Sequence, residues 1–214
     1  MIHTVFAITV ARLADLPPEG VAEVAFVGRS NAGKSSAINA LANQKRLAYV
    51  SKTPGRTQQL NFFRVGEGRY MVDLPGYGYA RAPFDLQRAW QSLAGEYLLR
   101  RACLRALMLI MDVRHPLTEL DRRLIAWWRP TGKPLHVLLS KADKLARGQA
   151  LAALRRVEAE LAQASIEGSV QLFSATRRLG LEEAEARLRT WLMLPPAADK
   201  KNPAQGDKAG WNEP

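Results

Sequence analysis

Cysteine is nearly absent from this 214-residue chain: Cys103 is its only cysteine, so no disulfide can form within the chain. Its neighbours in the sequence are apolar, so we expect Cys103 to be a small buried hydrophobic residue. Long apolar runs are missing too, because no stretch approaches the ~18 apolar residues that a transmembrane helix needs. The first 20 residues have no basic region ahead of an apolar one, so we expect no signal peptide. These features predict a protein of the reducing cytoplasm.

Acidic residues are fewer than basic ones: 20 Asp and Glu stand against 31 Lys and Arg, which leaves a net charge of +11. Such an excess favours polyanionic partners such as RNA or membrane headgroups, although a merely solvated basic surface would have the same composition. Histidine is scarce as well. No pair among His3, His115 and His136 has metal-ligand spacing, and His136 lies in an apolar strand pattern, as a hydrogen-bonded core imidazole would.

Apolar runs of strand length alternate with longer helical patterns, which is typical of a mostly parallel sheet with helices on both faces. The short GEG link at 66–68 predicts an antiparallel hairpin, so the fold class is α/β with a mixed, mostly parallel six-stranded sheet. The expected strands lie at 23–28, 61–65, 69–74, 106–113, 135–140 and 170–173, and the expected helices at 34–43, 84–101, 118–129, 147–164 and 181–193.

A glycine-rich loop, GRSNAGKSS, separates the first expected strand from the first expected helix. Gly28, Gly33, Lys34 and Ser35 satisfy G-x-x-x-x-G-K-[ST] in the strand-to-helix context that this motif requires. The glycines let backbone N–H groups turn toward phosphate oxygens, Lys34 would reach the β- and γ-phosphates, and Ser35 would bind Mg²⁺. A tight turn without a ligand is the alternative. We favour a P-loop NTPase that binds a nucleoside triphosphate.

The motif SKAD, at 140–143, follows directly on the fifth expected strand, at the carboxyl edge of the sheet where open α/β proteins bind ligands. Asp143 could accept two hydrogen bonds from the N1–H and amino group of guanine, and adenine has no such pair of donors. Lys141 would lay its aliphatic stem across the base. A helix-capping aspartate would explain this motif alone. FSAT at 173–176 ends the last strand at the same edge and offers the Ala175 N–H to guanine O6, so guanine is the predicted base.

Two further loops have the pattern of nucleotide-dependent switches. DLPG ends the third expected strand, so Asp73 would hold Mg²⁺ through a water and the Gly76 N–H would meet the γ-phosphate. TPGRT lies in a long polar segment and contains two candidates for a magnesium-binding threonine, Thr53 and Thr57. We prefer Thr57, because the Pro-Gly turn comes before it and the second expected strand follows.

Together GRSNAGKSS, TPGRTQQLNFF, DLPGYGYA, SKAD and FSAT resemble the EngB (YihA) family of bacterial GTP-binding proteins, within the TrmE-Era-EngA-EngB-septin-like GTPases. The resemblance implies a Mg²⁺-dependent GTPase switch that helps to assemble the large ribosomal subunit, with rRNA and ribosomal proteins as partners, and that is needed for normal cell division and septation. We expect a monomer with a lead-in over 1–20, an EngB-type G domain over 21–195 and a disordered tail over 196–214.

The resemblance also assigns functional residues. Magnesium falls on Ser35 and Thr57, beside the Asp73 already identified, and the expected catalytic groups are Lys34, Thr57, Gly76 and Asn31. Ser140 departs from the family pattern, which more often has Thr, but keeps the hydroxyl. The nucleotide contacts fall on Gly28, Arg29, Ser30, Asn31, Ala32, Gly33, Lys34, Ser35, Gly55, Arg56, Thr57, Gln58, Gln59, Asp73, Leu74, Pro75, Gly76, Ser140, Lys141, Ala142, Asp143, Phe173, Ser174 and Ala175.

Tyr77 stands where many small GTPases have the glutamine that orients the attacking water. An aromatic ring cannot do this, so slow intrinsic hydrolysis is predicted. Asn31 matches the asparagine with which potassium-activated relatives hold K⁺ beside the phosphates, which makes K⁺ a further candidate cofactor. A solvent-facing loop residue is the alternative at this position.

Two other functions fit parts of the pattern. A P-loop kinase for small molecules would share the phosphate loop, but it needs an acceptor pocket under a lid and would not select guanine. A nucleotide-gated binding module with negligible hydrolysis agrees with Tyr77. Competition between ATP and GTP separates the kinase from the switch, and single-turnover hydrolysis separates the binding module.

Overall fold

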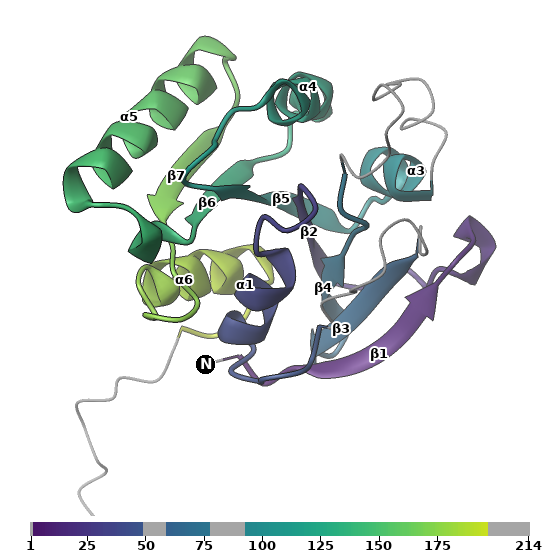
Figure 1. The fold of residues 1–214 in the computed structure, drawn as a ribbon. Helices are drawn as coiled ribbons and strands as arrows, with labels where there is room; N and C mark the ends of the chain where they lie inside the picture. The colour runs from purple at the N-terminus through teal and green to yellow at the C-terminus, as the bar shows by residue number, and fades with distance from the viewer. Residues whose placement is uncertain (1, 49–58, 78–92, 197–214) are drawn as a thin grey trace, which may run out of the picture.

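The computed structural model describes residues 2–48, 59–77 and 93–196. Within these residues the strands form one seven-stranded sheet with the order β1-β3-β4-β2-β5-β6-β7 (Figure 1). The strands are β1 (Val5–Val10), β2 (Ala22–Gly28), β3 (Leu60–Gly66), β4 (Arg69–Asp73), β5 (Leu104–Asp112), β6 (Leu135–Ser140) and β7 (Gly168–Leu172).

The sheet is mixed and mostly parallel, as predicted. Only β3 runs against its neighbours β1 and β4, and the predicted β3–β4 hairpin turns at Gly68 with φ of 62°. The predicted number of six strands is wrong, because β1 lies in the expected lead-in and pairs with β3. β1 sits at the edge of the sheet with Phe6 and Ile8 exposed, so it lacks the buried pattern by which the other strands were identified.

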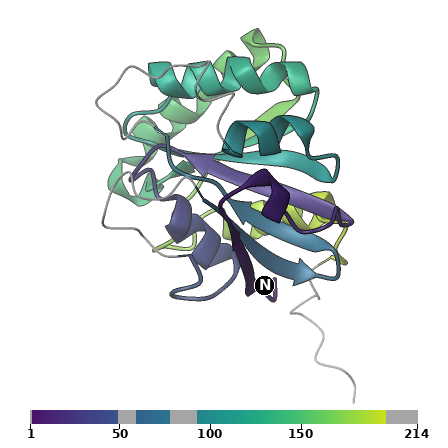
Figure 2. The ribbon, with the colours of Figure 1, turned by 90° about the vertical axis from the view of Figure 1, so that its right-hand side faces the viewer.

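Five helices of the described chain cover the two faces of the sheet (Figures 1 and 2). None of them is long and apolar enough to cross a membrane. Residues 84–92 of the second expected helix lie outside the described residues, as do 197–214 of the expected tail. The helices are α1 (Lys34–Leu41), α3 (Leu93–Arg100), α4 (Glu119–Trp128), α5 (Arg147–Gln163) and α6 (Leu181–Trp191), with short 3₁₀ turns η1 (Leu13–Asp15), η2 (Arg129–Thr131) and η3 (Ala142–Lys144).

Two hydrophobic cores hold these layers together, one on each face of the sheet. In β2, Ala25 and Val27 pack into the core beneath α3, α4 and α5, whereas Val24 and Phe26 pack into the core beneath α1 and α6. A strand buried on both faces reads as a nearly continuous apolar run, which is why β2, β5 and β6 were recognisable in the sequence. Their polar carboxyl ends meet at one edge of the sheet, where the candidate site lies.

A buried ion pair joins β2 to the end of α3 near the amino ends of the strands, away from the candidate site. Arg101 donates to Glu23 Oε1 over 2.6 Å and to the Pro18 carbonyl over 3.3 Å, and the Tyr97 hydroxyl donates to Glu23 Oε2 over 2.9 Å. The Glu23 side chain is fully buried. Such a carboxylate is tolerated inside a protein only with partners of this kind. The cluster therefore fixes α3 against the sheet.

Candidate nucleotide-binding site

The phosphate loop begins where β2 approaches β5 too closely for any side chain. A Cβ added to Gly28 would lie 2.6 Å from the Ile110 carbonyl oxygen, so only glycine fits there. Gly33 caps α1 with φ of 99°, and Asn31 also has a positive φ, of 63°. These angles turn the chain sharply between strand and helix, as the glycine pattern predicts, and place the N-terminus of α1 beside the loop.

Lys34 and Asp73 meet beside this loop. They form an ion pair between the first residue of α1 and the last residue of β4, and their side chains are only 12% and 10% exposed. The parallel register of β2 and β4 sets Asp73 opposite Phe26, next to the phosphate loop. The Asp73 carboxylate and the nearby Ser35 hydroxyl are hard oxygen donors of the kind that Mg²⁺ binds, so these residues fit that ion.

Asp143 lies at the carboxyl edge of the sheet, in η3 after β6. Its Oδ1 accepts a hydrogen bond of 2.6 Å from the Ser174 hydroxyl, which lies in the loop after β7. This bond holds the pKa of Asp143 below its ordinary value, so the side chain is an ionised acceptor at neutral pH. The helix-capping alternative is not observed, because Lys141 is the N-cap of η3 and no side chain caps it.

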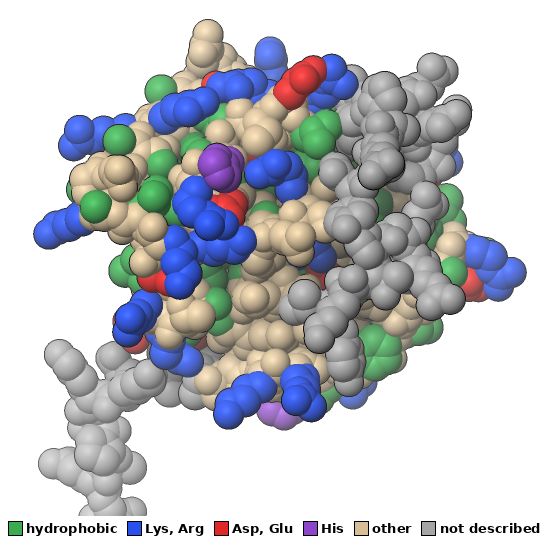
Figure 3. Space-filling view, in the orientation of Figure 1, with side chains coloured by type: hydrophobic (Ala, Val, Ile, Leu, Met, Phe, Trp, Pro, Cys, Tyr) green, Lys and Arg blue, Asp and Glu red, His purple; other side chains and the backbone are tan. Residues whose placement is uncertain are grey.

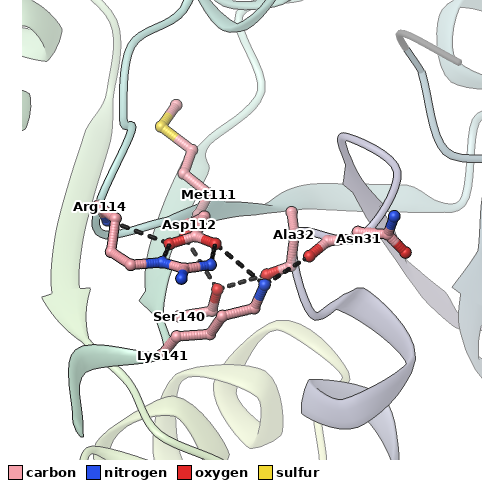
Figure 4. Close-up of polar contacts among 7 residues, drawn as sticks. All are labelled: Asn31, Ala32, Met111, Asp112, Arg114, Ser140 and Lys141. Atoms are coloured by element: carbon pink, nitrogen blue, oxygen red, sulfur yellow. Dashed lines mark hydrogen bonds and ion pairs between the residues drawn. The ribbon is translucent and has the colours of Figure 1, made fainter. Parts of the chain in front are cut away.

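Lys141 spans from the end of β6 to the phosphate loop (Figure 4). Its ammonium donates to the Asn31 carbonyl over 2.7 Å and to Asp112 Oδ2 over 2.9 Å. The neighbouring Ser140 hydroxyl is buried and donates to the Ala32 carbonyl and, over 3.0 Å, to the Met111 carbonyl. The base-side motif and the phosphate loop are thus joined directly.

Asp112 was not predicted from the sequence, although it organises this junction. It ends β5 and accepts hydrogen bonds from Lys141 and, over 2.9 and 2.7 Å, from the Arg114 guanidinium (Figure 4). Burial opposes its ionisation, but these bonds outweigh burial and hold the pKa of Asp112 well below its usual range. A carboxylate at the carboxyl end of a buried parallel strand was the signal that could have identified it.

Tyr77 ties the beginning of the second switch loop to the phosphate loop and to α4. Its backbone N–H donates to the Gly28 carbonyl over 3.3 Å, and its carbonyl accepts from the Ser30 N–H over 3.1 Å. Its hydroxyl donates over 2.6 Å to Asp121, a buried residue of α4 that also lies 3.9 Å from Arg29. Burial, with the Asp121 charge, raises the pKa of Tyr77 well above its ordinary value. Nothing in the sequence around Asp121 pointed to this contact.

The remaining predicted residues divide into three groups. The side chains of Ala32, Leu74, Ala142 and Phe173 are buried, so any contact with a ligand falls to their backbone. The Phe173 carbonyl accepts from the Ala142 N–H over 3.1 Å, which joins the two base-side loops. Gln59, Pro75, Gly76 and Ala175 are described and at least partly exposed, whereas Thr53, Gly55, Arg56, Thr57 and Gln58 lie outside the described residues.

A phosphate loop paired with a switch aspartate, and a guanine-type carboxylate at the same sheet edge, define a P-loop GTPase. The family model for 50S ribosome-binding GTPases matches residues 23–141. The chain is 56% identical over 207 residues to the probable GTP-binding protein EngB of Dechloromonas aromatica, covering 95% of this chain and 93% of that one. It is also 56% identical to the EngB protein of an Azoarcus species, over 93% and 95% of the two chains. The chain belongs to the EngB family of GTP-binding proteins.

The fold is also that of solved GTPases. A crystal structure of a probable GTP-binding protein EngB superposes with a TM-score of 0.62 at 19% identity, over 80% of this chain and 99% of the other. Membership of a GTPase family decides against the P-loop kinase.

Proposed function

We propose that this GTPase is a Mg²⁺-dependent switch that binds GTP and GDP and acts in assembly of the large ribosomal subunit. One observation carries the nucleotide assignment: Asp143, ionised and held by Ser174, stands at the same edge as the Lys141 bridge to the phosphate loop. This geometry presents a fixed double acceptor for the N1–H and amino group of guanine. Lys141 is placed to cover one face of the base.

When nucleotide and Mg²⁺ bind, Lys34 would pair with the phosphates and Asp73 with the ion. These contacts would replace the ion pair that the two side chains form with each other. In the loaded protein Lys34 would bind the β- and γ-phosphates, Ser35 and Thr57 would supply oxygen donors to the ion, and Asp73 would hold it through a water. When bound, Mg²⁺ would neutralise the negative charge that develops on the phosphates. The exchange of partners leaves neither side chain as an unpaired buried charge.

Hydrolysis is proposed to be slow because Tyr77, at the position where many small GTPases have glutamine, is engaged elsewhere. The Tyr77 hydroxyl donates to Asp121, and its ring packs against the hydrophobic core beneath α3, α4 and α5. Removing that hydroxyl should therefore leave turnover unchanged. Single-turnover hydrolysis by Tyr77→Phe, measured beside the parent chain, tests this; a drop of tenfold or more would assign the hydroxyl to catalysis.

Potassium is proposed as a second cation, at Asn31. Asn31 is exposed on the phosphate loop, and its backbone carbonyl accepts a hydrogen bond from Lys141, which leaves the side chain accessible. A K⁺ ion beside the phosphates could supply positive charge to the transition state, as an arginine finger does. Turnover in KCl should exceed turnover in NaCl, and Asn31→Ala should remove the difference. Equal rates in the two salts would exclude this role.

The ribosomal partner is supported by the description of the matching family as 50S ribosome-binding and by the net charge of +11. We place the work of the protein in the cytoplasm, where it acts as a monomer on the large subunit or its precursor, in contact with rRNA and ribosomal proteins. Cells that lack the protein would then fail in normal division and septation because they make too few ribosomes.

Sedimentation with large ribosomal subunits tests the switch. With a non-hydrolysable GTP analogue the protein should pellet with subunits, and with GDP it should stay largely in the supernatant. The Asp143→Ala variant is the matched control, because it should lose the nucleotide dependence. Equal pelleting of the parent chain with GTP analogue and with GDP would contradict a switch.

A nucleotide-gated binding module with negligible hydrolysis is the second candidate, and the Tyr77–Asp121 contact favours it. The two functions differ in what the ribosome does to the bound nucleotide. Single-turnover hydrolysis should accelerate in the presence of large subunits if the protein is a switch that resets itself. A rate that stays at the level of free GTP with and without subunits would favour the module.

A further inference from the structure

The loops that follow β5, β6 and β7 carry more positive charge than a nucleotide needs. Residues 112–118, 140–147 and 173–180 contain six cationic side chains and two carboxylates. Both carboxylates are engaged, because Asp112 binds Lys141 and Arg114 and Asp143 accepts from Ser174. We define the basic rim as the five cations that extend beyond the base-side contacts: Arg114, Lys144, Arg147, Arg177 and Arg178.

The basic rim is accessible. All five side chains are on exposed residues, and Lys and Arg side chains gather over this part of the molecule in Figure 3. Within the described residues, the guanidinium groups of Arg147 and Arg177 form no ion pair. Arg114 and Lys144 remain 44% and 62% exposed despite their acidic neighbours. Arg147 and Arg177 thus contribute uncompensated charge to the rim, and the six cations of these loops exceed their two carboxylates by four.

The spacing of the loops suits an extended polyanion. Adjacent strands lie about 4.8 Å apart, so three loops in a row spread these cations over roughly 10 Å of the sheet edge. A phosphodiester backbone presents charges in such a line, whereas a single phosphate does not. Leu179 is the one large apolar side chain that is strongly exposed in these loops, which leaves no apolar face for insertion into a membrane.

We propose that the basic rim is the surface with which this protein docks on RNA of the large ribosomal subunit. The inference rests on the proposed function and assigns its docking face. It also couples docking to the nucleotide, because the rim belongs to the loops that would read guanine: the Arg177 N–H donates to Ser174 over 3.1 Å, and Lys144 lies 3.4 Å from Asp143. RNA over these loops should slow the release of a non-hydrolysable GTP analogue.

A pair of charge reversals tests the surface. Arg147→Glu/Arg177→Glu removes two positive charges from the rim and adds two negative ones. The matched control is Arg105→Glu/Arg129→Glu, which changes the net charge equally at the amino end of β5 and in η2, the turn that precedes β6. Binding to purified large subunits is measured at several KCl concentrations. We expect the rim variant to bind about tenfold or more weakly with a reduced salt slope, and the control to bind within about threefold of the parent.

The outcomes separate the two proposals. GDP affinity, measured by calorimetry, should be unchanged in both variants, which shows that they fold. Equal loss of subunit binding in the rim and control variants, or no loss in the rim variant, would overturn the docking face while leaving the switch intact. Failure of the parent chain to bind subunits in any nucleotide state would overturn both. Tighter binding to anionic phosphatidylglycerol vesicles than to subunits would overturn the RNA assignment.

Dissociation of a fluorescent, non-hydrolysable GTP analogue gives an independent readout. With large subunits present, the analogue should leave the parent chain about threefold or more slowly, because docked RNA restricts the loops after β6 and β7. The rim variant should release it at the same rate with and without subunits. Release that is equally slowed in the rim variant would contradict the coupling.

Discussion

At the scale of single residues, Asp143 has the sharpest role. Replacing it by alanine would remove the two proposed charge-assisted hydrogen bonds to guanine, each worth about 1.5–3 kcal/mol. GDP affinity of Asp143→Ala, measured by calorimetry, should fall about 100-fold or more. The matched control is Lys144→Ala, the exposed neighbour, which should stay within about threefold of the parent. An unchanged GDP affinity in Asp143→Ala would remove the guanine assignment altogether.

Asp112 would affect the ligand indirectly, through Lys141. It holds the Lys141 ammonium at 2.9 Å, and Asp112→Asn keeps the shape of the side chain but removes its charge. Lys141 then loses its ion pair and covers the base less well, so GDP should bind about 3- to 10-fold more weakly. Arg114→Ala leaves the contact between Asp112 and Lys141 in place and serves as the control. A GDP affinity that falls equally in both variants would show that Asp112 does not act through Lys141.

The sequence identified some of these residues and missed others for a physical reason. Lys34, Lys141 and Asp143 belong to contiguous motifs whose roles follow from a strand end and a turn, which are local properties. Asp112 and Asp121 depend on contacts that exist only when separate strands and helices come together. The residues next to Asp121 therefore give no sign of its contact, and for Asp112 only its position at the end of a buried strand could have done so.

At the scale of elements, α3 is held against the sheet by the ion pair between Arg101, which follows the helix, and Glu23. Arg101 is 6% exposed against a fully buried Glu23, whereas its neighbour Arg100 is 77% exposed and pairs with Glu96. Arg101→Met would leave Glu23 as an unpaired buried carboxylate and should lower the free energy of unfolding by about 3–5 kcal/mol. Arg100→Met should cost about 1 kcal/mol or less. Urea denaturation of the two variants measures the difference, and equal losses would contradict the role of the cluster.

The pairing of β6 with β7 contains a pH-dependent element. His136 is fully buried, and its ring nitrogens lie 2.9 Å from Ser169 Oγ and 2.9 Å from Gln171 Oε1, as expected for a core imidazole. Burial lowers the pKa of His136 from 6.5 to about 4. Between these values the unfolded chain binds a proton that the folded chain does not, so stability present above pH 6.5 is lost as the pH falls toward 4.

That shift corresponds to about 3 kcal/mol of folding stability. His136→Gln, which cannot titrate, should lose less stability than the parent chain over this pH range, and urea denaturation at pH 7, 5.5 and 4.5 measures both. Parallel pH profiles for the two chains would show that folding does not shift the pKa of His136.

Most elements could be predicted because their signals are local. The expected helix at 118–129 is observed as α4 (Glu119–Trp128), whose start is fixed by hydrogen bonds between Thr118 and Asp121. β1 was missed although VFAITV is rich in strand-forming residues. An isolated N-terminal strand does not reveal which edge of a sheet it will join, since that choice depends on β3, more than 50 residues away.

At the scale of the whole molecule, the nucleotide site collects loops from the ends of β2, β4, β5, β6 and β7. A ligand bound there contacts segments from residue 28 to residue 175, so its binding energy adds to the stability of the entire fold. GDP with Mg²⁺ at about 100 times its Kd should stabilise the folded chain by about 2.7 kcal/mol. For a chain of this size that raises the melting temperature by roughly 5–10 °C.

The same measurement distinguishes guanine from adenine. ADP has the same diphosphate for the phosphate loop but no pair of donors for Asp143, so at equal concentration it should raise the melting temperature by about 2 °C or less. Adding EDTA should lower the shift given by GDP, because Ser35 and Asp73 then lose the ion that links them to the phosphates. An equal shift by ADP and GDP would mean that the phosphate loop alone determines binding and that the base-side loops do not select the ligand.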